Sequence, residues 1–227
     1  ITRPCKYEQP KHHVFEIFVL PSKYGEGCPT SILEAFSFKL PVIAYCIDGI
    51  PELVSHTKEL GMHSLAITDH GSLYGAVEFY SECKEAGIKP IIGFEVYVAH
   101  SSRRDKSSSE RSPHHLVLLA RDNVGYQNLM QLVTQAHLEG FHYRPRIDKE
   151  LLTERSEGLI CLSGCPSAEV PKLLSEGNLE GAKAVAIWYQ ELFKDGYFLE
   201  LQAHQHVPQL DEINQGWLNL AKSYLFH

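Results

Sequence analysis

The sequence lacks the features of secreted and membrane proteins. None of its apolar runs approaches the roughly 20 residues that a membrane-spanning helix needs, and its opening, ITRPCKYEQPKHH, contains no apolar signal core. The six cysteines form no CxxC pair and no regular framework of the kind that disulfide-rich secreted domains show. We therefore expect a cytoplasmic protein without membrane partners and with reduced cysteines.

Positive charge is also in short supply. Lys and Arg number 21 against 28 Asp and Glu, and the resulting net charge of −7 argues against a broad DNA-binding surface. The apolar fraction of 44% and the charged fraction of 22% are ordinary for a globular protein. A chain of 227 residues can bury the core of one large domain or two small ones. Thirteen histidines are many for this length and favour metal chemistry.

The most informative stretch is LAITDHGSLYGAVEFYSECKEAGIKPIIGFEVYV, residues 65–98. Residues 65–67 form a short apolar run that is typical of a buried strand. Ser72 is a candidate cap for the following helix, and Gly87 is placed to close it. Residues 90–98 form a second strand. The apolar positions of the predicted helix recur at three- and four-residue spacing: Ala76, Val77, Phe79, Tyr80 and Cys83.

Side chains that can bind a metal ion accompany these two strands. Asp69 and His70 follow the first strand, and Glu95 lies within the second between Phe94 and Val96. Strand ends and the loops after them hold the chemistry in such α/β units. A carboxylate buried among apolar residues needs a partner, whereas a histidine in a turn can also be satisfied by backbone groups.

Strands and helices alternate along the rest of the chain, which predicts an α/β fold with parallel pairing. If 90–98 and 115–120 instead form a hairpin, His115 returns beside the end of the strand that carries Glu95. Asn123 or Asp122 can cap one helix, and Asn178 another. The further strands are predicted at 15–20, 41–45, 115–120, 158–163 and 196–202, and the helices at 30–38, 123–137, 167–175, 178–194 and 208–224.

The segment HSSRRDKSSSERSPH, residues 100–114, has no apolar periodicity and is locally basic. Two interpretations are open. A solvated, mobile loop is the usual outcome for such a charge run. Alternatively, its cations contact a phosphate backbone. These cations are Arg103, Arg104, Lys106 and Arg111.

The motifs in this order resemble the N-terminal PHP (polymerase and histidinol phosphatase) domain of bacterial DNA polymerase III alpha subunits. The resemblance continues from the stretch above through HHLVLLARDNVGYQNLMQLV, FHYRPRIDKELL, GLICLSGCPSAEVPKLL and GYFLELQAH, and covers roughly residues 58–227. Several motifs in sequence are more specific than one short pattern. The resemblance implies a distorted (β/α)7 barrel, here incomplete.

In that family, the matching His, Glu, His and Cys bind up to three divalent metal ions, and a metal-bound hydroxide attacks a phosphoester. The resemblance implies Zn, Mn or Fe here, with His70 and Glu95 also catalytic. The tandem His114-His115 leaves the register of the third ligand open, and the resemblance favours His115. Cys165 taken alone would be a buried small side chain. Asp69 is expected to support His70 or cap the turn. The ligand set implied by the resemblance is His70, Glu95, His115 and Cys165.

The sequence departs from the family pattern at both ends. The opening H-x-H strand is absent, and the adjacent His12 and His13 would point to opposite faces of a strand. The closing Asp-x-His motif would follow the last predicted helix and is also absent. His204 and His206 are expected to be surface polar residues. The resemblance therefore implies an impaired phosphoesterase or 3′-5′ exonuclease, with a non-catalytic structural module as the alternative.

The same resemblance implies that the chain is the N-terminal part of a longer replicative DNA-directed DNA polymerase, which is a nucleotidyltransferase. Its partners would be DNA, reached through the full-length polymerase, and other replisome subunits. The palm, fingers and thumb of a polymerase have no counterpart here, so the chain is not expected to polymerise DNA by itself.

The segment before residue 54 resembles a different family. FVLPSKYGEGCPTSILEAFSFKLPVIAYCIDGIPELV is similar to the nucleotide-sugar-binding region of retaining GT-B glycosyltransferases of the family-4 type. The shared E-x7-E motif is Glu26 and Glu34, and in that family the second Glu contacts the donor ribose. The resemblance implies nucleotide-sugar binding as a third hypothesis. We predict two domains, 1–54 and 55–227, and expect residues 1–50 to pack into the same α/β sheet as the rest.

Overall fold

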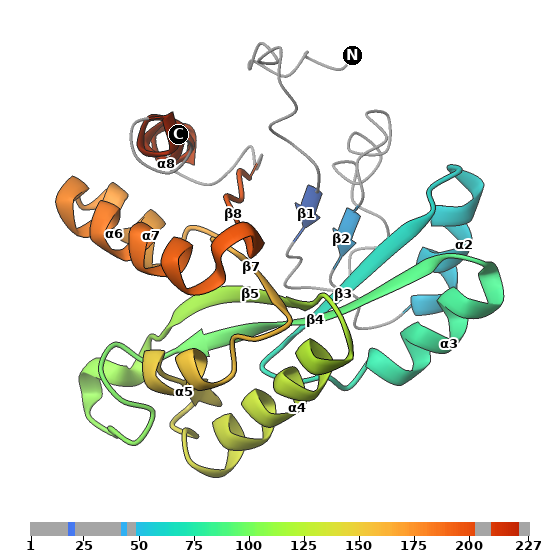
Figure 1. Cartoon of the computed structure of the whole chain (residues 1–227), viewed down its shortest axis with the longest axis horizontal. Helices are drawn as coiled ribbons and strands as arrows, with labels where there is room; N and C mark the ends of the chain where they lie inside the picture. The colour runs from blue at the N-terminus through green and yellow to red at the C-terminus, as the bar shows by residue number, and fades with distance from the viewer. Residues whose placement is uncertain (1–17, 21–41, 45–48, 203–209, 223–227) are drawn as a thin grey trace.

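The computed structural model describes residues 18–20, 42–44, 49–202 and 210–222. The described chain is organised around one mixed sheet with strand order β1-β2-β3-β4-β5-β7-β8, in which β6 pairs with β4 (Figure 1). The strands are β1 Phe18–Leu20, β2 Val42–Ala44, β3 Ser64–His70, β4 Lys89–Val98, β5 His114–Ala120, β6 Arg146–Ile147, β7 Leu159–Leu162 and β8 Tyr197–Phe198. The helices are α2 Ile50–Glu59, α3 Ala76–Ala86, α4 Asn123–Leu138, α5 Lys149–Glu154, α6 Glu169–Ser175, α7 Leu179–Phe193 and α8 Leu210–Leu220.

The predicted α/β class is confirmed, with one strand that reverses direction. Strands β1 to β4 pair in parallel, as do β4 with β6 and β7 with β8. Strand β5 is antiparallel to both β4 and β7, because a loop rather than a crossover helix joins β4 to β5. Among the described strands no pairing joins β8 to β1, so the sheet is an open, incomplete barrel, as predicted.

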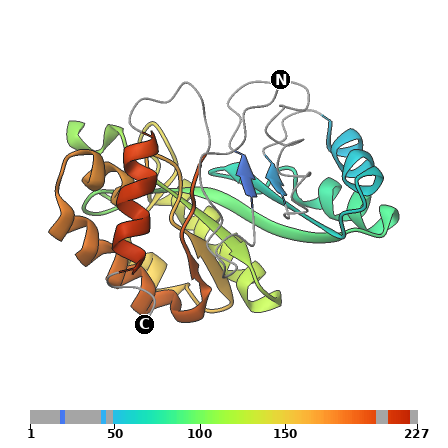
Figure 2. The same cartoon turned by 90° about the horizontal axis from the view of Figure 1, so that it is seen from above.

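Helices cover the sheet at both ends. Helices α2 and α3 pack together at one end, and α6, α7 and α8 gather at the other, while α4 crosses one face (Figures 1 and 2). The larger apolar core lies between β4, β5, β7 and the helices α4 to α8, and a smaller core lies under α2 and α3. The sequence analysis missed helix α5 and the two-residue strand β6.

The N-terminal strands belong to the same sheet as the rest of the chain. Strand β2 pairs with β3 through Val42 opposite Leu65 and Ala44 opposite Ile67. The predicted sharing of one sheet is therefore confirmed for the described strands. Helix α2 runs without a break across the predicted domain join near residue 54, and the division at that point stays a prediction. The predicted helix at 30–38 and the residues Glu26 and Glu34 lie outside the described residues, as do His12, His13, His204 and His206.

Helix α3 corrects two details of the sequence analysis. Its buried positions are Ala76, Phe79 and Cys83, whereas Val77 and Tyr80 are 74% and 50% exposed. The apolar residues form two stripes about 100° apart on the helix, and only one stripe can face the sheet.

The start of α3 is not capped by Ser72, because the helix begins at Ala76 after Gly75 and makes no side-chain cap. Instead, Asp69 Oδ2 accepts a hydrogen bond of 2.8 Å from the backbone N–H of Gly75. Gly87 ends the helix in the left-handed conformation, as predicted. The predicted caps of α4 and α7 are confirmed as Asp122 and Asn178. Each side chain accepts a hydrogen bond from the backbone N–H three residues further along the chain.

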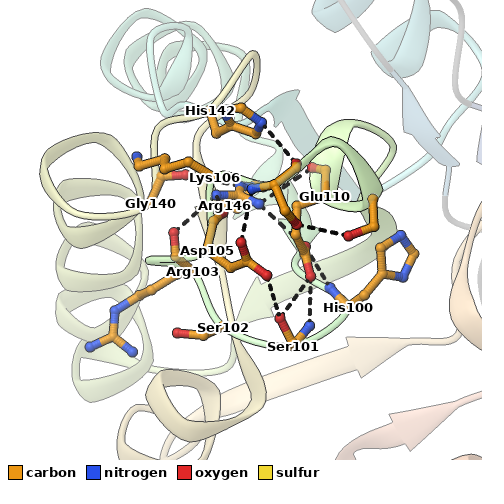
Figure 3. Close-up of polar contacts among 12 residues, drawn as sticks. His100, Ser101, Ser102, Arg103, Asp105, Lys106, Glu110, Gly140, His142 and Arg146 are labelled. Atoms are coloured by element: carbon orange, nitrogen blue, oxygen red, sulfur yellow. Dashed lines mark hydrogen bonds and ion pairs between the residues drawn. The ribbon is translucent and has the colours of Figure 1, made fainter.

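The basic segment between β4 and β5 is anchored by buried ion pairs, so the prediction of a fully solvated loop is wrong (Figure 3). Arg103 is 5% exposed and Glu110 is 1% exposed. The fully buried Arg146 of β6 donates to Glu110 Oε2 at 3.2 Å and to the carbonyl oxygens of Arg103, Asp105 and Gly140 at 3.0, 2.7 and 3.0 Å. The loop is therefore held to β6 from within.

The predicted phosphate contacts of this segment need a similar correction. Arg103 is paired with Asp148 at 2.8 Å and with Glu139 at 2.9 Å, and Arg104 is paired with the same Glu139 at 2.8 Å. Lys106 donates to the carbonyl oxygen of Phe141. Those three cations are engaged with the protein itself. The fourth, Arg111, lies at the end of a short 3-10 helix, Ser108–Arg111, and stacks over the ring of Tyr143.

Candidate functional site

The sheet register brings the predicted site residues together. In the parallel pair of β3 and β4, His70 lies opposite Glu95, and in the antiparallel pair of β4 and β5, Tyr97 lies opposite His115. Cys165 follows β7, which is the next strand after β5 in the sheet. The predicted hairpin of 90–98 with 115–120 is confirmed. Four ligand-type side chains thus come from neighbouring strand ends.

Glu95 is the centre of this cluster. Its Oε1 atom lies 2.7 Å from His70 Nδ1 and 2.8 Å from His115 Nδ1, so both imidazoles contact the same carboxylate oxygen. Cys165 Sγ lies 3.5 Å from His115 Nδ1. The Glu95 side chain is 5% exposed, and the two histidine side chains are 16% and 18% exposed. The cluster is a closed group of mutual contacts below the surface.

The protonation states follow from burial and these contacts. Burial alone would raise the pKa of Glu95, but the hydrogen bonds and charges of His115 and His70 outweigh it and lower the pKa to about 2. Burial, with the added charge of Glu95, raises the pKa of the Cys165 thiol to about 12. At neutral pH the cluster therefore contains a carboxylate and, in the absence of a cation, a protonated thiol.

Asp69 has a structural position at the edge of the cluster. Burial raises its pKa, against the hydrogen bond from Gly75 and the charge of His70. Its carboxylate holds the turn that leads into α3. The expectation that Asp69 caps this turn is confirmed.

Tyr97 is a member of the cluster that the sequence analysis missed. Its ring stacks on His70 with the centroids 6.2 Å apart at 13°, and meets His115 edge-on at 5.2 Å. At 5% exposure it fixes the orientation of both imidazoles. The signal was available, because residues i and i+2 of a strand share a face and Glu95 and Tyr97 have this spacing.

Glu200 was missed as well. It is buried just beyond β8, and burial raises its pKa to about 7, with the charge of Glu95 acting in the same direction. Its carboxylate accepts from Gln202, and its backbone N–H donates to Ser163 Oγ at 2.8 Å. A second carboxyl group therefore lies near the cluster, and about half of it is protonated at pH 7. No local pattern in the sequence marked it.

As it stands, the cluster is not a metal cage. Within residues 49–202 and the other described segments, no group of three or more His, Cys, Asp and Glu side chains is arranged to hold a metal ion. Two ligands of one tetrahedral Zn²⁺ are about 3.3 Å apart, given Zn–N bonds of about 2.0–2.1 Å. The separations of 2.7 and 2.8 Å between Glu95 and the histidines are shorter and belong to direct side-chain contacts.

A cavity of about 450 Å³ opens beside His115. Tyr97 and His115 belong to its wall, and so do three cationic side chains from separate segments. These cations are Arg111, Arg144 and Lys172.

The fold and the cluster define an α/β protein with His, Glu and Cys side chains at the ends of neighbouring strands. The model of the PHP domain family matches residues 43–204, and the chain belongs to that family. The model of glycosyl transferases group 1 matches residues 11–72, so the two matches overlap. Both resemblances predicted from the sequence are found.

Curated relatives are DNA polymerase III alpha subunits. The chain is 50% identical over 164 residues to the subunit of Chlamydia pneumoniae and 45% identical over 174 residues to that of Borreliella burgdorferi. These alignments cover 70% and 74% of this chain but only 13% and 15% of the relatives. The subunit of Thermus aquaticus is 45% identical over 164 residues. The chain thus matches a small part of each relative.

Among solved structures, a protein from Bifidobacterium adolescentis described as a metal-dependent phosphoesterase aligns with a TM-score of 0.48 at 14% identity, over 79% of this chain and 82% of that one. No helix in the part of the chain described by the structure has the length and apolar character needed to cross a membrane.

Proposed function

We propose that this chain is the PHP module of a DNA polymerase III alpha-like protein and that its cluster binds a divalent metal ion for phosphoester hydrolysis. The proposed ligands are His70, Glu95, His115 and Cys165. The observation that carries the proposal is their convergence, with neighbouring donor atoms 2.7–3.5 Å apart although the residues span nearly a hundred positions of sequence. The proposed partners, by way of the relatives, are DNA and other replisome subunits.

The donor set suits a divalent ion such as Zn, Mn or Fe. Imidazole and thiolate ligands favour zinc-like ions, and a carboxylate can bridge two of them. When bound, the ion would supply a hydroxide nucleophile and stabilise charge on the phosphorus oxygens. Glu95 is ionised at neutral pH and ready to bind a cation, whereas Cys165 has to release its proton as the ion binds. The two imidazoles have to separate from Glu95 by about half an ångström to reach tetrahedral spacing.

The test is the metal content of the purified chain, measured by elemental mass spectrometry after gel filtration. We expect about one or more tightly held ions per chain, and a loss of that metal in Glu95→Gln. Glu78→Gln is the matched control, because Glu78 is exposed on α3 away from the cluster. A folded protein that holds no metal would overturn the proposal.

Activity is tested separately with a single-stranded oligonucleotide and added Mn²⁺ or Zn²⁺. Cleavage that disappears in Glu95→Gln and in His70→Ala supports the proposed catalytic role of these residues. Cleavage that persists in both variants, or without metal, would point to a contaminating nuclease.

A non-catalytic structural module is the alternative, and the closed state of the cluster favours it. His70 Nδ1 and His115 Nδ1 approach Glu95 Oε1 to 2.7 and 2.8 Å with no cation between them. Under this alternative, EDTA leaves the melting temperature unchanged, both in the wild-type chain and in His70→Ala. A drop of many degrees in EDTA would count against it, since a ligand that binds only the folded state stabilises that state.

Nucleotide-sugar binding by the N-terminal segment rests on the match to glycosyl transferases group 1 alone. A thermal shift with UDP- or GDP-sugars that is lost in Glu34→Ala but kept in Glu78→Ala would support this hypothesis. Glu26→Ala should then weaken the shift as well. No shift with either sugar class would exclude it.

A further inference from the structure

The cavity beside His115 is cationic in a chain that is acidic overall. Arg111, Arg144 and Lys172 line it, and none of its lining residues is an Asp or Glu. The whole chain carries a net charge of −7. Three positive charges gathered without a carboxylate therefore set this cavity apart from the average surface.

Within the part of the chain that the structure describes, these three cations have no carboxylate at ion-pair distance, unlike neighbouring cations in the sequence. Among the described residues, none of the ion pairs involves Arg111, Arg144 or Lys172. Arg103 and Arg146, by contrast, are each paired with a buried carboxylate. The fold has thus neutralised the cations it buries and kept the cavity cations available.

Two of the three cations are held in orientation by aromatic rings. The guanidinium of Arg144 lies 5.5 Å from the ring centroid of Tyr97, and that of Arg111 lies 5.1 Å from the centroid of Tyr143. Stacking uses the face of a guanidinium and leaves its N–H edges free for a bidentate contact with phosphate. This arrangement suits an oxyanion better than it suits an apolar ligand.

The cavity adjoins the cluster directly. His115 lines the cavity and contacts Glu95, while Tyr97 lines the cavity and stacks on His70. An anion held in the cavity therefore lies against His115. A volume of about 450 Å³ is within the range of small-ligand sites and has room for a nucleotide.

We propose that Arg111, Arg144 and Lys172 form a phosphate-binding subsite that holds a phosphodiester group of a single-stranded nucleic acid beside His115. The inference rests on the proposed function, since it assigns positioning residues to the same site. Three cations confined to one cavity fit only a few phosphates, so the subsite grips the strand locally rather than along its length.

The test measures binding of a fluorescently labelled single-stranded oligonucleotide of about 10 nucleotides by anisotropy, in EDTA so that nothing is cleaved. We expect Arg144→Gln, Arg111→Gln and Lys172→Gln each to weaken binding about tenfold, as the loss of one charge-assisted contact does. The salt dependence should correspond to about two to three phosphate contacts, with a slope of roughly −2 in log K against log salt. Arg144→Lys should retain part of the affinity, because the charge remains while the bidentate edge is lost.

Arg121→Gln is the matched control. Arg121 is an exposed arginine paired with Asp195 outside the cavity, so its replacement should change the affinity less than twofold. All three cavity cations are also exposed, so their replacement leaves the core intact. Wild-type affinity in the cavity variants, or an equal loss in Arg121→Gln, would overturn the subsite.

Competition with inorganic phosphate distinguishes a site for free phosphate from a site for the phosphodiester groups of a nucleic acid. We expect phosphate to compete with the oligonucleotide but to bind at least about a hundredfold more weakly, because it contributes one anion rather than a strand. Equal affinity for both would mean a site for free phosphate and would overturn the nucleic-acid assignment.

Metal content of the same variants separates this inference from the proposed function. We expect Arg144→Gln to keep its metal and lose oligonucleotide affinity, whereas Arg121→Gln keeps both its metal and its oligonucleotide affinity. A metal-free chain whose oligonucleotide binding depends on the cavity cations would keep the subsite and refute the metal proposal. A metal-loaded chain whose oligonucleotide binding does not depend on these cations would keep the metal proposal and refute the subsite.

Discussion

Replacing Arg146 by methionine tests the anchoring of the β4–β5 loop more directly than any other change. Arg146 is fully buried and donates to the Glu110 carboxylate and to four carbonyl oxygens. Three of these carbonyls belong to the loop (Arg103, Asp105 and Glu110), and the fourth is that of Gly140. Methionine fills a similar length without charge or donors. The variant therefore leaves the Glu110 carboxylate buried without its cation and removes one donor from each of four carbonyl oxygens.

The expected loss is about 3–5 kcal/mol in the free energy of unfolding, which is the cost of removing one partner from a buried ion pair. Arg121→Met gives the matched comparison. Its pair with Asp195 has side chains 43% and 82% exposed, and such surface pairs contribute about 0–1 kcal/mol. A protein near the middle of the ordinary stability range of about 5–15 kcal/mol remains folded after either change.

The assay is urea unfolding followed by far-ultraviolet circular dichroism. Glu110→Gln and the double variant complete a double-mutant cycle, which isolates the energy of the pair from other consequences of each change. We expect a coupling of about 1–3 kcal/mol and early proteolytic cleavage within residues 100–112 of Arg146→Met. A loss in Arg146→Met no larger than that in Arg121→Met would refute the anchoring role of the network.

Three further changes test burial and packing elsewhere. Glu200 has a pKa of about 7 against an ordinary value of 4.5, so the folded state binds its proton more tightly than the unfolded state does. In EDTA, the free energy of unfolding should therefore fall by about 3 kcal/mol as the pH rises from 4.5 through 7. Glu200→Gln should remove this pH dependence. The pH dependence contributed by Glu95 has the opposite sign, because its pKa of about 2 lies below the ordinary value of 4.5. Its contribution to stability is present above pH 4.5 and is lost as the pH falls toward 2. Unfolding of Glu95→Gln measured over the same acid range should lack this loss. Gly125→Ala should lower the free energy of unfolding by about 3 kcal/mol, measured in urea, because the new Cβ would overlap the carbonyl oxygen of Gly158. Gly177→Ala should lower it by about 1 kcal/mol, because the space around Gly177 is open but its φ is +73°. Equal losses in the two variants would contradict the packing argument.

The parts of the fold that follow from short-range patterns were predictable. The caps Asp122 and Asn178 and the closing Gly87 each act within a few residues of their own position, and all three are confirmed. The hairpin of β4 with β5 follows from two apolar runs joined by a polar segment. Strand register then placed His70, Glu95 and His115 together, although their roles as ligands stay a proposal.

The parts that depend on distant partners were not predictable from local patterns. Residues 100–114 read as a solvated charge run because the carboxylates that bury Arg103 lie 36 and 45 positions away in Glu139 and Asp148. Arg146 sits in a stretch with no strand signal, since β6 is only two residues long. The face of α3 was equally open, because only contact with the sheet decides between its two apolar stripes.

The buried ion pairs and two of the cavity cations belong to the same segments of the chain. Glu110, Glu139 and Asp148 neutralise the two buried cations, Arg146 and Arg103. Glu139 also pairs with Arg104, which lies at the surface. Arg111 follows Glu110 directly in the chain, and Arg144 precedes Arg146 by two residues. Fixing the paired members of each segment therefore also fixes the backbone from which the unpaired cations reach the cavity. A loop that looks expendable by composition is in this way the element that sets positive charge beside Glu95 and its histidines.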